Sequence, residues 1–298
     1  MPSLLDSLAM RPLVLDGGLG TLLERHGHDL SSALWSTQTL LDDPEAVRTA
    51  HGEYLAAGAE IVITGSYQVG YDELATRGID AGAVDVLLAT SVRLAREARD
   101  AAGGEAWVAA SIGPFGAMRA DGSEYTGEYG IGVAELRAWH RPRLHALAAA
   151  GPDLLAAETI PSLAEVEALA AELSGTGIPA WISVTPAFGR MRSGERLEEA
   201  FAVAAAVDEV IALGVNCCDP LEVSPAIAAA RAVTDKPVVV YPNSGEQWDA
   251  KNRRWVGRPG VPDELVTSWL DAGARIVGGC CRIGPAEIAR IAAVVSAR

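Results

Sequence analysis

The sequence lacks long apolar runs and an excess of basic residues, and its first residues do not have the pattern of a signal peptide; each absence argues against a class of protein. No apolar run reaches the roughly 18 residues that a membrane-spanning helix requires. Among 298 residues, 24 Lys and Arg oppose 39 Asp and Glu, a formal net charge of −15. Nucleic acid or an anionic membrane is therefore a poor partner, because such binding requires a basic face. The first residues contain no basic stretch before an apolar core, so we expect no signal peptide and a cytoplasmic protein.

The rest of the composition is that of a globular protein. Hydrophobic residues make up 49% of the chain and charged residues 21%, while 31 Gly and 16 Pro are too few for a low-complexity chain. Short β-branched or apolar runs alternate with longer Ala- and Leu-rich segments of helical spacing. The predicted strands are Pro12–Leu15, Glu60–Thr64, Trp107–Ile112, Asp153–Ala157, Ala180–Val184, Val210–Val215, Pro237–Tyr241 and Ala274–Val277. The predicted helices are Glu45–Ala57, Ala83–Ala102, Val133–Ala149, Leu163–Leu173, Leu197–Val207, Leu221–Val233, Pro262–Ala272 and Pro285–Ala297.

Strict alternation of eight strands and eight helices predicts a parallel sheet closed into a (β/α)8 barrel of the TIM type. A doubly wound open sheet is the alternative. Such a barrel commonly occupies about 250 residues, so we expect a single domain over residues 1–298. Its chemistry should lie just after the carboxyl ends of the strands, at the mouth of the barrel.

The four cysteines form two adjacent pairs, Cys217 with Cys218 and Cys280 with Cys281, which follow the sixth and eighth predicted strands. These strands are two positions apart around a closed barrel. Cys217, Cys280 and Cys281 could therefore supply three thiolates to a tetrahedral Zn²⁺ with one position open, as in catalytic zinc sites. A thiol substrate would bind there as its thiolate. The alternative is that these are buried cysteines acting as small hydrophobes; Cys218 we interpret in that way.

Asp16 and the glycines Gly17, Gly18 and Gly20 follow the first predicted strand and open a helix, whose N–H groups could bind a carboxylate. The segment has neither the P-loop nor the dinucleotide-binding glycine pattern. Asp16 and Glu158 together could hold an ammonium group. With the amides for a carboxylate and the zinc for a thiolate, the site would then suit an amino acid with a thiol side chain. The alternatives are a helix cap for Asp16 and a salt bridge inside the barrel for Glu158.

Histidine chemistry receives no support. His26 and His28 form an H-x-H pattern like that of zinc hydrolases, but they lie some ten residues past the first predicted strand, so we expect them at the surface. No Ser/His/Asp or Cys/His set can be placed at the mouth, which leaves nucleophilic acyl transfer without a candidate.

The motifs at the mouth extend over essentially the whole chain. They are Leu15 to Thr21, Leu34-Trp35-Ser36, Ala57 to Glu60, Ser66-Tyr67-Gln68, Ala120 to Tyr125, Ala157 to Pro161, Gly214 to Cys217, Tyr241 to Glu246, and Gly278 to Arg282. With these motifs, above all Asn216-Cys217 and Gly279-Cys280-Cys281-Arg282, the chain resembles the homocysteine S-methyltransferase family, in its branch that uses S-methylmethionine or S-adenosylmethionine.

This resemblance implies zinc on Cys217, Cys280 and Cys281, with the homocysteine thiolate as fourth ligand. It implies that Asp16 and Glu158 bind the amino group of L-homocysteine and that the amides around Gly17 and Gly18 bind its carboxylate. Other substrate-binding residues implied by the motifs are Asn216, Tyr67, Gln68 and Glu124. The thiolate would attack a sulfonium methyl in line, giving methionine without a general acid or base, because the leaving group is a neutral thioether.

A cationic donor requires π faces or carboxylates in its pocket. The candidates on the mouth loops are Tyr67, Phe115, Glu124, Tyr125 and Trp248, for each of which ordinary packing is the alternative. The segment Thr185 to Gly194 departs from the acidic loop common in the family, which leaves the donor open.

Other functions remain as alternatives. A betaine-type or other thiol S-methyltransferase would share the zinc barrel, although betaine types usually carry a C-terminal extension. A zinc hydrolase would use histidine and carboxylate ligands. A noncatalytic zinc- or thiol-binding barrel would bind the metal without turnover. The sequence does not define the oligomeric state.

Overall fold

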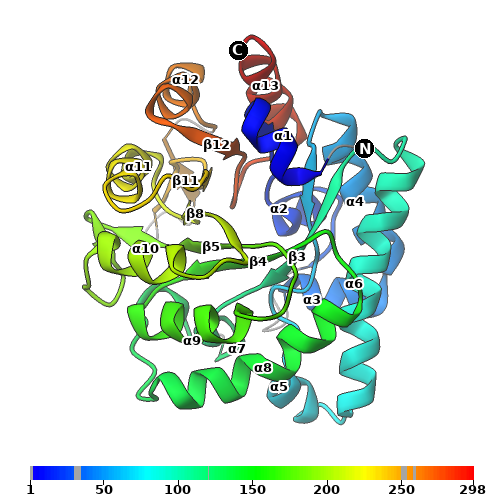
Figure 1. The fold of residues 1–298 in the computed structure, drawn as a ribbon. Helices are drawn as coiled ribbons and strands as arrows, with labels where there is room; N and C mark the ends of the chain where they lie inside the picture. Colours follow the sequence, from blue (N-terminus) through cyan, green and yellow to red (C-terminus); the bar gives the residue numbers. More distant parts are fainter. Residues whose placement is uncertain (1–2, 30–34, 120, 250–253, 258–259) are drawn as a thin grey trace.

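Eight parallel strands form a barrel in the computed structural model, which describes residues 3–29, 35–119, 121–249, 254–257 and 260–298 (Figure 1). The strands are β1 (Leu13–Val14), β2 (Ile61–Ile63), β3 (Trp107–Ile112), β4 (Leu154–Ile160), β5 (Ala180–Val184), β8 (Val210–Asn216), β9 (Val238–Tyr241) and β12 (Ala274–Val277). Their order is β1-β12-β9-β8-β5-β4-β3-β2, and a parallel bridge between Leu15 and Ile61 brings the first strand against the second. The predicted (β/α)8 barrel is confirmed, and the open sheet is wrong.

Eight helices follow the strands and cover the outside of the barrel. They are α4 (Pro44–Ala56), α6 (Ala81–Ala101), α8 (Val133–Ala149), α9 (Leu163–Leu173), α10 (Leu197–Ala205), α11 (Val223–Arg231), α12 (Asp263–Ala272) and α13 (Pro285–Ser296). Local signals define several starts: the side chains of Asp43, Asp80 and Ser162 accept from the first turns of α4, α6 and α9. The predicted helix bounds are therefore close to the observed ones.

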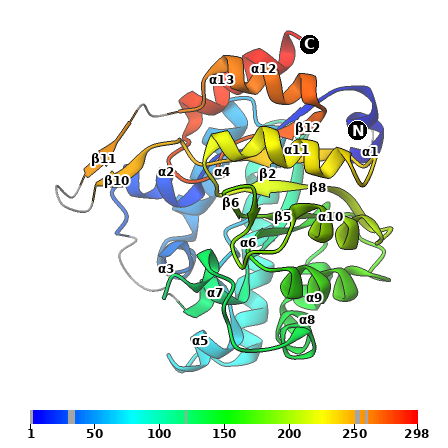
Figure 2. The same ribbon diagram turned by 90° about the vertical axis from the view of Figure 1, so that its left-hand side faces the viewer.

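The two faces of each strand contribute to two separate cores. Residues pointing outward, such as Val108, Leu155 and Val240, pack against the helices. The inward set includes Trp107, Trp181 and Tyr241, which are large enough to fill the barrel interior. The helix α1 (Leu4–Met10) adds Leu4 and Leu8 to this inner core. It closes the end of the barrel away from the mouth, opposite the β10–β11 hairpin in Figure 2.

Several short elements lie on the loops; of these only the helix that opens after Asp16 was predicted, because a few residues leave too little periodicity to detect. Around the mouth these are α2 (Leu19–Arg25), α3 (Trp35–Asp42), α5 (Tyr71–Ala75), α7 (Phe115–Arg119), the 3₁₀ turns η1 (Ser123–Tyr125) and η2 (Pro220–Glu222), and the hairpins β6–β7 (Pro186–Ala187, Arg190–Met191) and β10–β11 (Gln247–Asp249, Arg254–Val256). Within the described residues, no helix is long and apolar enough to cross a membrane.

One strand boundary matters for the site. The strand β4 continues to Ile160, beyond the predicted end at Ala157, with a register shift against β5 between these two residues. Glu158 consequently lies inside the strand rather than after it, and Thr159 adopts a left-handed φ of 61°. The irregularity directs the carboxylate of Glu158 toward the barrel interior, where Ser111 donates a hydrogen bond to it.

Candidate active site

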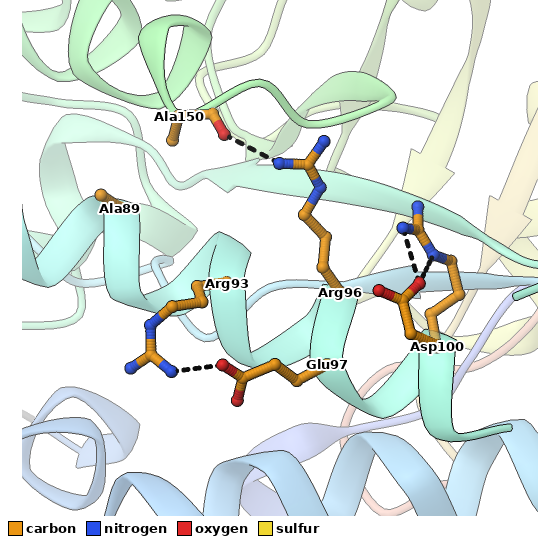
Figure 3. Close-up of a pocket in the computed structure, with 7 residues that line it drawn as sticks. Ala89, Arg93, Arg96, Glu97, Asp100 and Ala150 are labelled. Atoms are coloured by element: carbon orange, nitrogen blue, oxygen red, sulfur yellow. Dashed lines mark hydrogen bonds and ion pairs between the residues drawn. The ribbon is translucent and has the colours of Figure 1, made fainter.

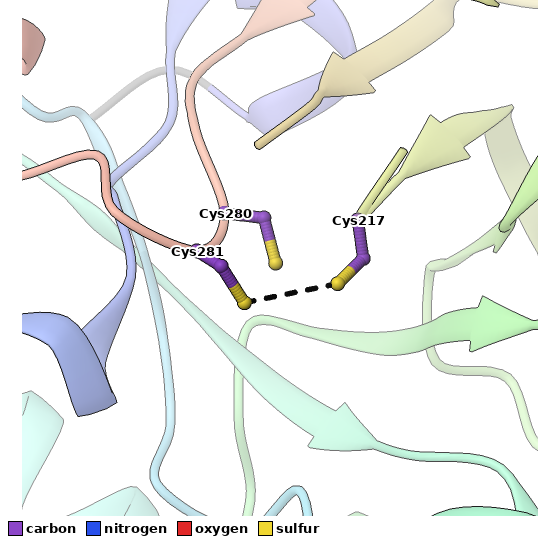
Figure 4. A group of neighbouring side chains, drawn as sticks. All are labelled: Cys217, Cys280 and Cys281. Carbon is purple, nitrogen blue, oxygen red and sulfur yellow. Dashed lines mark hydrogen bonds between the residues drawn. The ribbon is translucent and has the colours of Figure 1, made fainter. Parts of the chain in front are cut away.

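Three cysteine side chains meet at the mouth of the barrel. Cys217 follows β8, whereas Cys280 and Cys281 follow β12, and β9 lies between these two strands. The three Sγ atoms lie within 4.8 Å of one another, and those of Cys217 and Cys281 are 3.9 Å apart (Figure 4). Cys217 is buried, while the other two are partly accessible. The three cysteines predicted as ligands are thus brought together.

The backbone around the cysteines is fixed by the loop after β9. The N–H of Cys280 donates to Pro242 O at 2.8 Å, and the N–H of Cys281 donates to Asn243 Oδ1 at 3.0 Å. Cys217 adopts a left-handed φ of 52°, uncommon for a residue with a side chain. Such strain is maintained only where the surroundings fix the chain, and it directs the Cys217 thiol toward the other two.

The donor set fits a soft or borderline metal ion. Hydrogen bonds from Cys280 and Cys281 hold the pKa of Cys217 well below its usual range. Three sulfur donors suit a tetrahedral zinc site with one position left for a substrate. Cys218 is different: it belongs to the outer hydrophobic core, and burial raises the pKa of its thiol. This placement agrees with its interpretation as a packing residue.

Two buried carboxylates lie deeper in the mouth. Asp16 Oδ2 accepts from the N–H of Ile63 at 2.8 Å, whereas its Oδ1 is buried and has no partner among the described residues. Burial, and secondarily the charge of Glu158, raises the pKa of Asp16. Burial likewise raises the pKa of Glu158 to about 7. A desolvated, partly unsatisfied pair of acids is an incomplete arrangement that a ligand ammonium would complete.

The glycines after β1 are required by close packing. A Cβ on Gly17 would lie 2.4 Å from Ile283 O, and one on Gly18 would lie 2.6 Å from Cys280 O. The N–H of Gly18 donates to Ile283 O at 2.9 Å, so this amide is already used and is a weaker candidate for carboxylate binding than predicted. Among the described residues, no acceptor receives the N–H groups of Gly17, Leu19 and Gly20, at the start of α2.

Tyr125 contacts the thiols, with its Oη 3.3 Å from Cys217 Sγ. Beside it in η1, Glu124 has a buried Oε2 that no group in the described part of the chain contacts by a hydrogen bond, and burial raises the pKa of its carboxyl. Burial also raises the pKa of Tyr67, ahead of the charge of Cys217. The structure therefore places Tyr67, Glu124 and Tyr125, all predicted as donor candidates, around the cysteine cluster.

The segment that carries Tyr125 is fixed by a buried hydrogen-bonded pair, Glu165 and His140, that the sequence did not reveal. Glu165 of α9 accepts from the backbone N–H of Phe115 at 2.6 Å and from Tyr129 Oη at 2.9 Å. Its Oε1 also lies 2.8 Å from His140 Nε2, and both side chains are fully buried. Glu165 thus fixes both ends of the α7–η1 segment.

The remaining predicted residues have mixed placements. Gln68 Nε2 donates to Ala117 O at 2.9 Å and leaves its Oε1 buried without a partner. Asn216 Oδ1 accepts from Thr159 N at 2.7 Å and from Ser183 Oγ at 2.8 Å, so this oxygen is used within the protein rather than left for a substrate. Phe115 packs edge-on against Tyr129 and Trp139, away from the thiols. The Trp248 and Trp35 side chains, Leu34 and Ala120 lie outside the described residues.

The histidines and the outer cavity do not form an alternative site. His26 is exposed and pairs with Glu53 at 3.1 Å, and His28 is half-buried. A cavity of about 420 Å³ lies on the outer surface of α6 and beside Ala150 (Figure 3). Its arginines already have partners: Arg93 pairs with Glu97 at 2.6 Å, and Arg96 donates to Ala150 O at 3.4 Å.

The fold and this site define a (β/α)8-barrel protein whose mouth carries three cysteines able to hold a metal ion. The family model for homocysteine S-methyltransferase matches residues 13–295. Homocysteine S-methyltransferase 4 of Zea mays is 45% identical, covering 95% of this chain and 89% of its own length. The Escherichia coli homocysteine S-methyltransferase is 42% identical and covers 94% of both chains. The chain belongs to the homocysteine S-methyltransferase family, and the resemblance drawn from its motifs is confirmed.

Solved structures agree with this assignment. The crystal structure of the E. coli homocysteine methyltransferase MmuM in its metallated form superposes with a TM-score of 0.86, at 40% identity, over 95% of this chain and 96% of the other. The same enzyme in its apo form gives a TM-score of 0.77. A Selenocysteine Se-methyltransferase of Brassica oleracea is 40% identical over 93% of this chain. The chain is thus an enzyme of the methyltransferase class.

Proposed function

We propose that this enzyme transfers a methyl group from a sulfonium donor, S-methylmethionine or S-adenosylmethionine, to the sulfur of L-homocysteine, and that the whole reaction takes place in one barrel domain. The observation that carries the proposal is the combination of three converging thiols with two buried acids at the same mouth. Soft donors suit a sulfur ligand, and paired carboxylates suit an amino acid. Because the thiols must stay reduced, we place the enzyme in a reducing compartment such as the cytoplasm.

We assign Zn²⁺ as the metal, held by Cys217, Cys280 and Cys281. When bound there, zinc would lower the pKa of the homocysteine thiol and keep the resulting thiolate nucleophilic. The chain itself would orient the substrate: Asp16 and Glu158 face its ammonium group, and the free N–H groups at Gly17, Leu19 and Gly20 face its carboxylate.

The transfer balances without a protein acid or base. The thiol proton of homocysteine leaves to solvent, and a sulfur lone pair forms a bond to the methyl carbon. The bond from that carbon to the donor sulfur breaks, and its electron pair stays on the donor as a neutral thioether. The residues then serve chiefly to align two sulfurs about one methyl group. The rings of Tyr125 and Tyr67 and the carboxyl of Glu124 lie where a sulfonium would approach.

Methionine formation by the zinc-loaded protein tests the proposal directly. L-homocysteine is supplied with S-methylmethionine, S-adenosylmethionine or betaine in parallel reactions, and methionine is measured by chromatography. We expect turnover with at least one sulfonium and none with betaine. Turnover with betaine alone would overturn the donor assignment. No turnover with stoichiometric zinc would favour another thiol acceptor or a noncatalytic barrel.

The use of homocysteine should depend on pH through Glu158. Burial raises the pKa of this carboxyl to about 7, so below that pH the group loses the charge that the ammonium requires. We expect kcat/KM for homocysteine, at saturating donor, to fall by up to about tenfold per pH unit below pH 7. The measurement is kcat/KM for homocysteine as a function of pH, from about pH 6 to pH 9. In Glu158→Gln this acid limb should flatten; an unchanged limb would remove Glu158 from the binding site.

A further inference from the structure

We propose that Arg192 binds the carboxylate of the methyl donor, so that the enzyme selects sulfonium compounds with a free carboxylate, as in a methionine-derived donor. This inference rests on the proposed function, because it concerns the second substrate of the same site. It comes from a half-buried guanidinium, stacked on Tyr125 near the cysteine cluster, that has no acidic partner among the described residues.

Arg192 is held at the mouth by the segment that follows β5. Its neighbour Met191 is buried and pairs with Pro186 across the β6–β7 hairpin. On the other side, Ser193 Oγ donates to Pro161 O at 3.0 Å, just beyond β4. The hairpin turn is fixed as well, since the N–H groups of Phe188 and Gly189 donate to the Glu222 carboxylate at 2.9 and 2.8 Å. The backbone on both sides of Arg192 is therefore positioned.

The side chain of Arg192 lies over the ring of Tyr125, whose hydroxyl contacts the cysteine cluster. Its Cζ lies 5.5 Å from the centre of the Tyr125 ring, and Tyr125 Oη lies 3.3 Å from Cys217 Sγ. One aromatic ring thus separates the guanidinium from the thiols.

One nitrogen of the guanidinium is unsatisfied. Within the described part of the chain, Arg192 Nε is buried without a hydrogen-bond partner, and no carboxylate forms an ion pair with Arg192. Its neighbours on the same segment differ: Arg190 donates to Gly194 O at 2.9 Å, and Arg196 pairs with Glu198 at 3.3 Å. A partly desolvated donor without an acceptor is costly, so a ligand acceptor at this place would be favourable.

The position of Arg192 around the barrel separates it from the homocysteine end. In the ring of strands β5 stands opposite β1, with three strands between them in either direction. Asp16 and the start of α2 follow β1, whereas Arg192 follows β5. In-line transfer requires the donor sulfur on the far side of the methyl group from the acceptor sulfur. The donor should therefore extend toward the β5 side of the mouth.

Charge then decides the orientation of the donor. A guanidinium repels a sulfonium but binds a carboxylate through two parallel hydrogen bonds. The sulfonium would face Tyr125 and the thiols, and the carboxylate would face Arg192. The buried, unpartnered Oε2 of Glu124 is available for the donor ammonium. An amino acid linked to its sulfonium by a short carbon chain matches this arrangement.

The test compares S-methyl-L-methionine with its carboxamide, which has nearly the same shape but no carboxylate charge. For the wild type we expect a preference for the acid of roughly 10- to 100-fold in kcat/KM. Arg192→Met should lower turnover of the acid by this factor and leave the carboxamide and the KM of homocysteine unchanged. Arg192→Lys should recover part of the preference, since it keeps the charge. Arg190→Met on the same hairpin is the matched control and should behave as the wild type.

Calorimetric titration of each donor compound, without homocysteine, separates this inference from the proposed function. Binding that requires both the carboxylate and Arg192, without methionine formation, would retain the inference and reject the reaction. Turnover that Arg192→Met leaves unchanged, or reduces equally for acid and carboxamide, would reject the inference and retain the reaction. Neither binding nor turnover in the wild type would overturn both.

Discussion

Replacing Cys217 with serine is expected to lower methionine formation by more than about 100-fold and to reduce the bound metal to a substoichiometric level. Removal of a residue that only supports a metal ligand costs about 10- to 100-fold, and loss of one of three direct ligands should cost more. Cys217, Cys280 and Cys281 all belong to the cluster, with their Sγ atoms within 4.8 Å of one another. The fourth cysteine, Cys218, lies in the outer hydrophobic core and cannot replace Cys217 as a ligand. Zinc content by atomic absorption and methionine formation by chromatography measure the two effects.

The matched control is the adjacent cysteine. Cys218→Ser makes the same chemical change one residue away, in the outer hydrophobic core. It should leave zinc content and turnover nearly unchanged and lower the thermal stability modestly, because a buried hydroxyl without a partner costs about 1–3 kcal/mol. Full zinc occupancy and normal activity in Cys217→Ser would remove this residue from the ligand set. The same test applies to Cys281→Ser.

Asp16→Asn is expected to raise the KM for homocysteine by roughly 10- to 100-fold with a smaller effect on the KM of the donor. Hydrogen bonds to charged groups contribute about 1.5–3 kcal/mol, and Asp16 Oδ1 is buried with no protein partner to compensate. The asparagine retains an oxygen that can accept from the N–H of Ile63, as Asp16 Oδ2 does at 2.8 Å, so the barrel should fold. Steady-state kinetics at saturating donor measures the change.

A similar carboxylate at the other end of the strands provides the control. Asp153 Oδ2 accepts from the N–H of Val108 at 2.7 Å, just before β4. Asp153→Asn makes the same substitution at a strand N–H without approaching the cysteines, and its KM for homocysteine should equal that of the wild type. An unchanged KM in Asp16→Asn, with metal content intact, would show that Asp16 supports only the backbone.

The strand pattern was predictable because each strand of a (β/α)8 barrel carries a short apolar run that does not depend on distant residues. The bounds of β3, β5 and β12 coincide with their predicted ranges. The cysteine cluster was predictable for a related reason. Once the order of the strands is known, the residues that follow β8 and β12 must meet at one mouth.

The contacts that complete the site depend on distant packing, which a single sequence does not contain. The N–H of Gly18 is used by Ile283, a residue at the other end of the chain, so its availability could not be judged locally. His140 and Glu165 form a buried pair but lie on two separate helices. Taken alone, each residue has the pattern of an ordinary polar position on a helix, so the sequence does not predict the pair. Tyr125 could be proposed as an aromatic candidate, but its approach to Cys217 depends on the short segment that Glu165 holds.

The closure of the barrel by Leu15 and Ile61, beside the pairing of β1 with β12, has a consequence for biosynthesis. The first strand finds its outer neighbour only when the last strand has left the ribosome, and the same late segment brings Cys280 and Cys281. A nascent or prematurely terminated chain that stops before residue 274 would present an unpaired strand edge on β9 and a lone Cys217. Such a chain would depend on chaperones or be degraded, so the sulfur cluster assembles and the barrel closes in a single step once β12 has been synthesised.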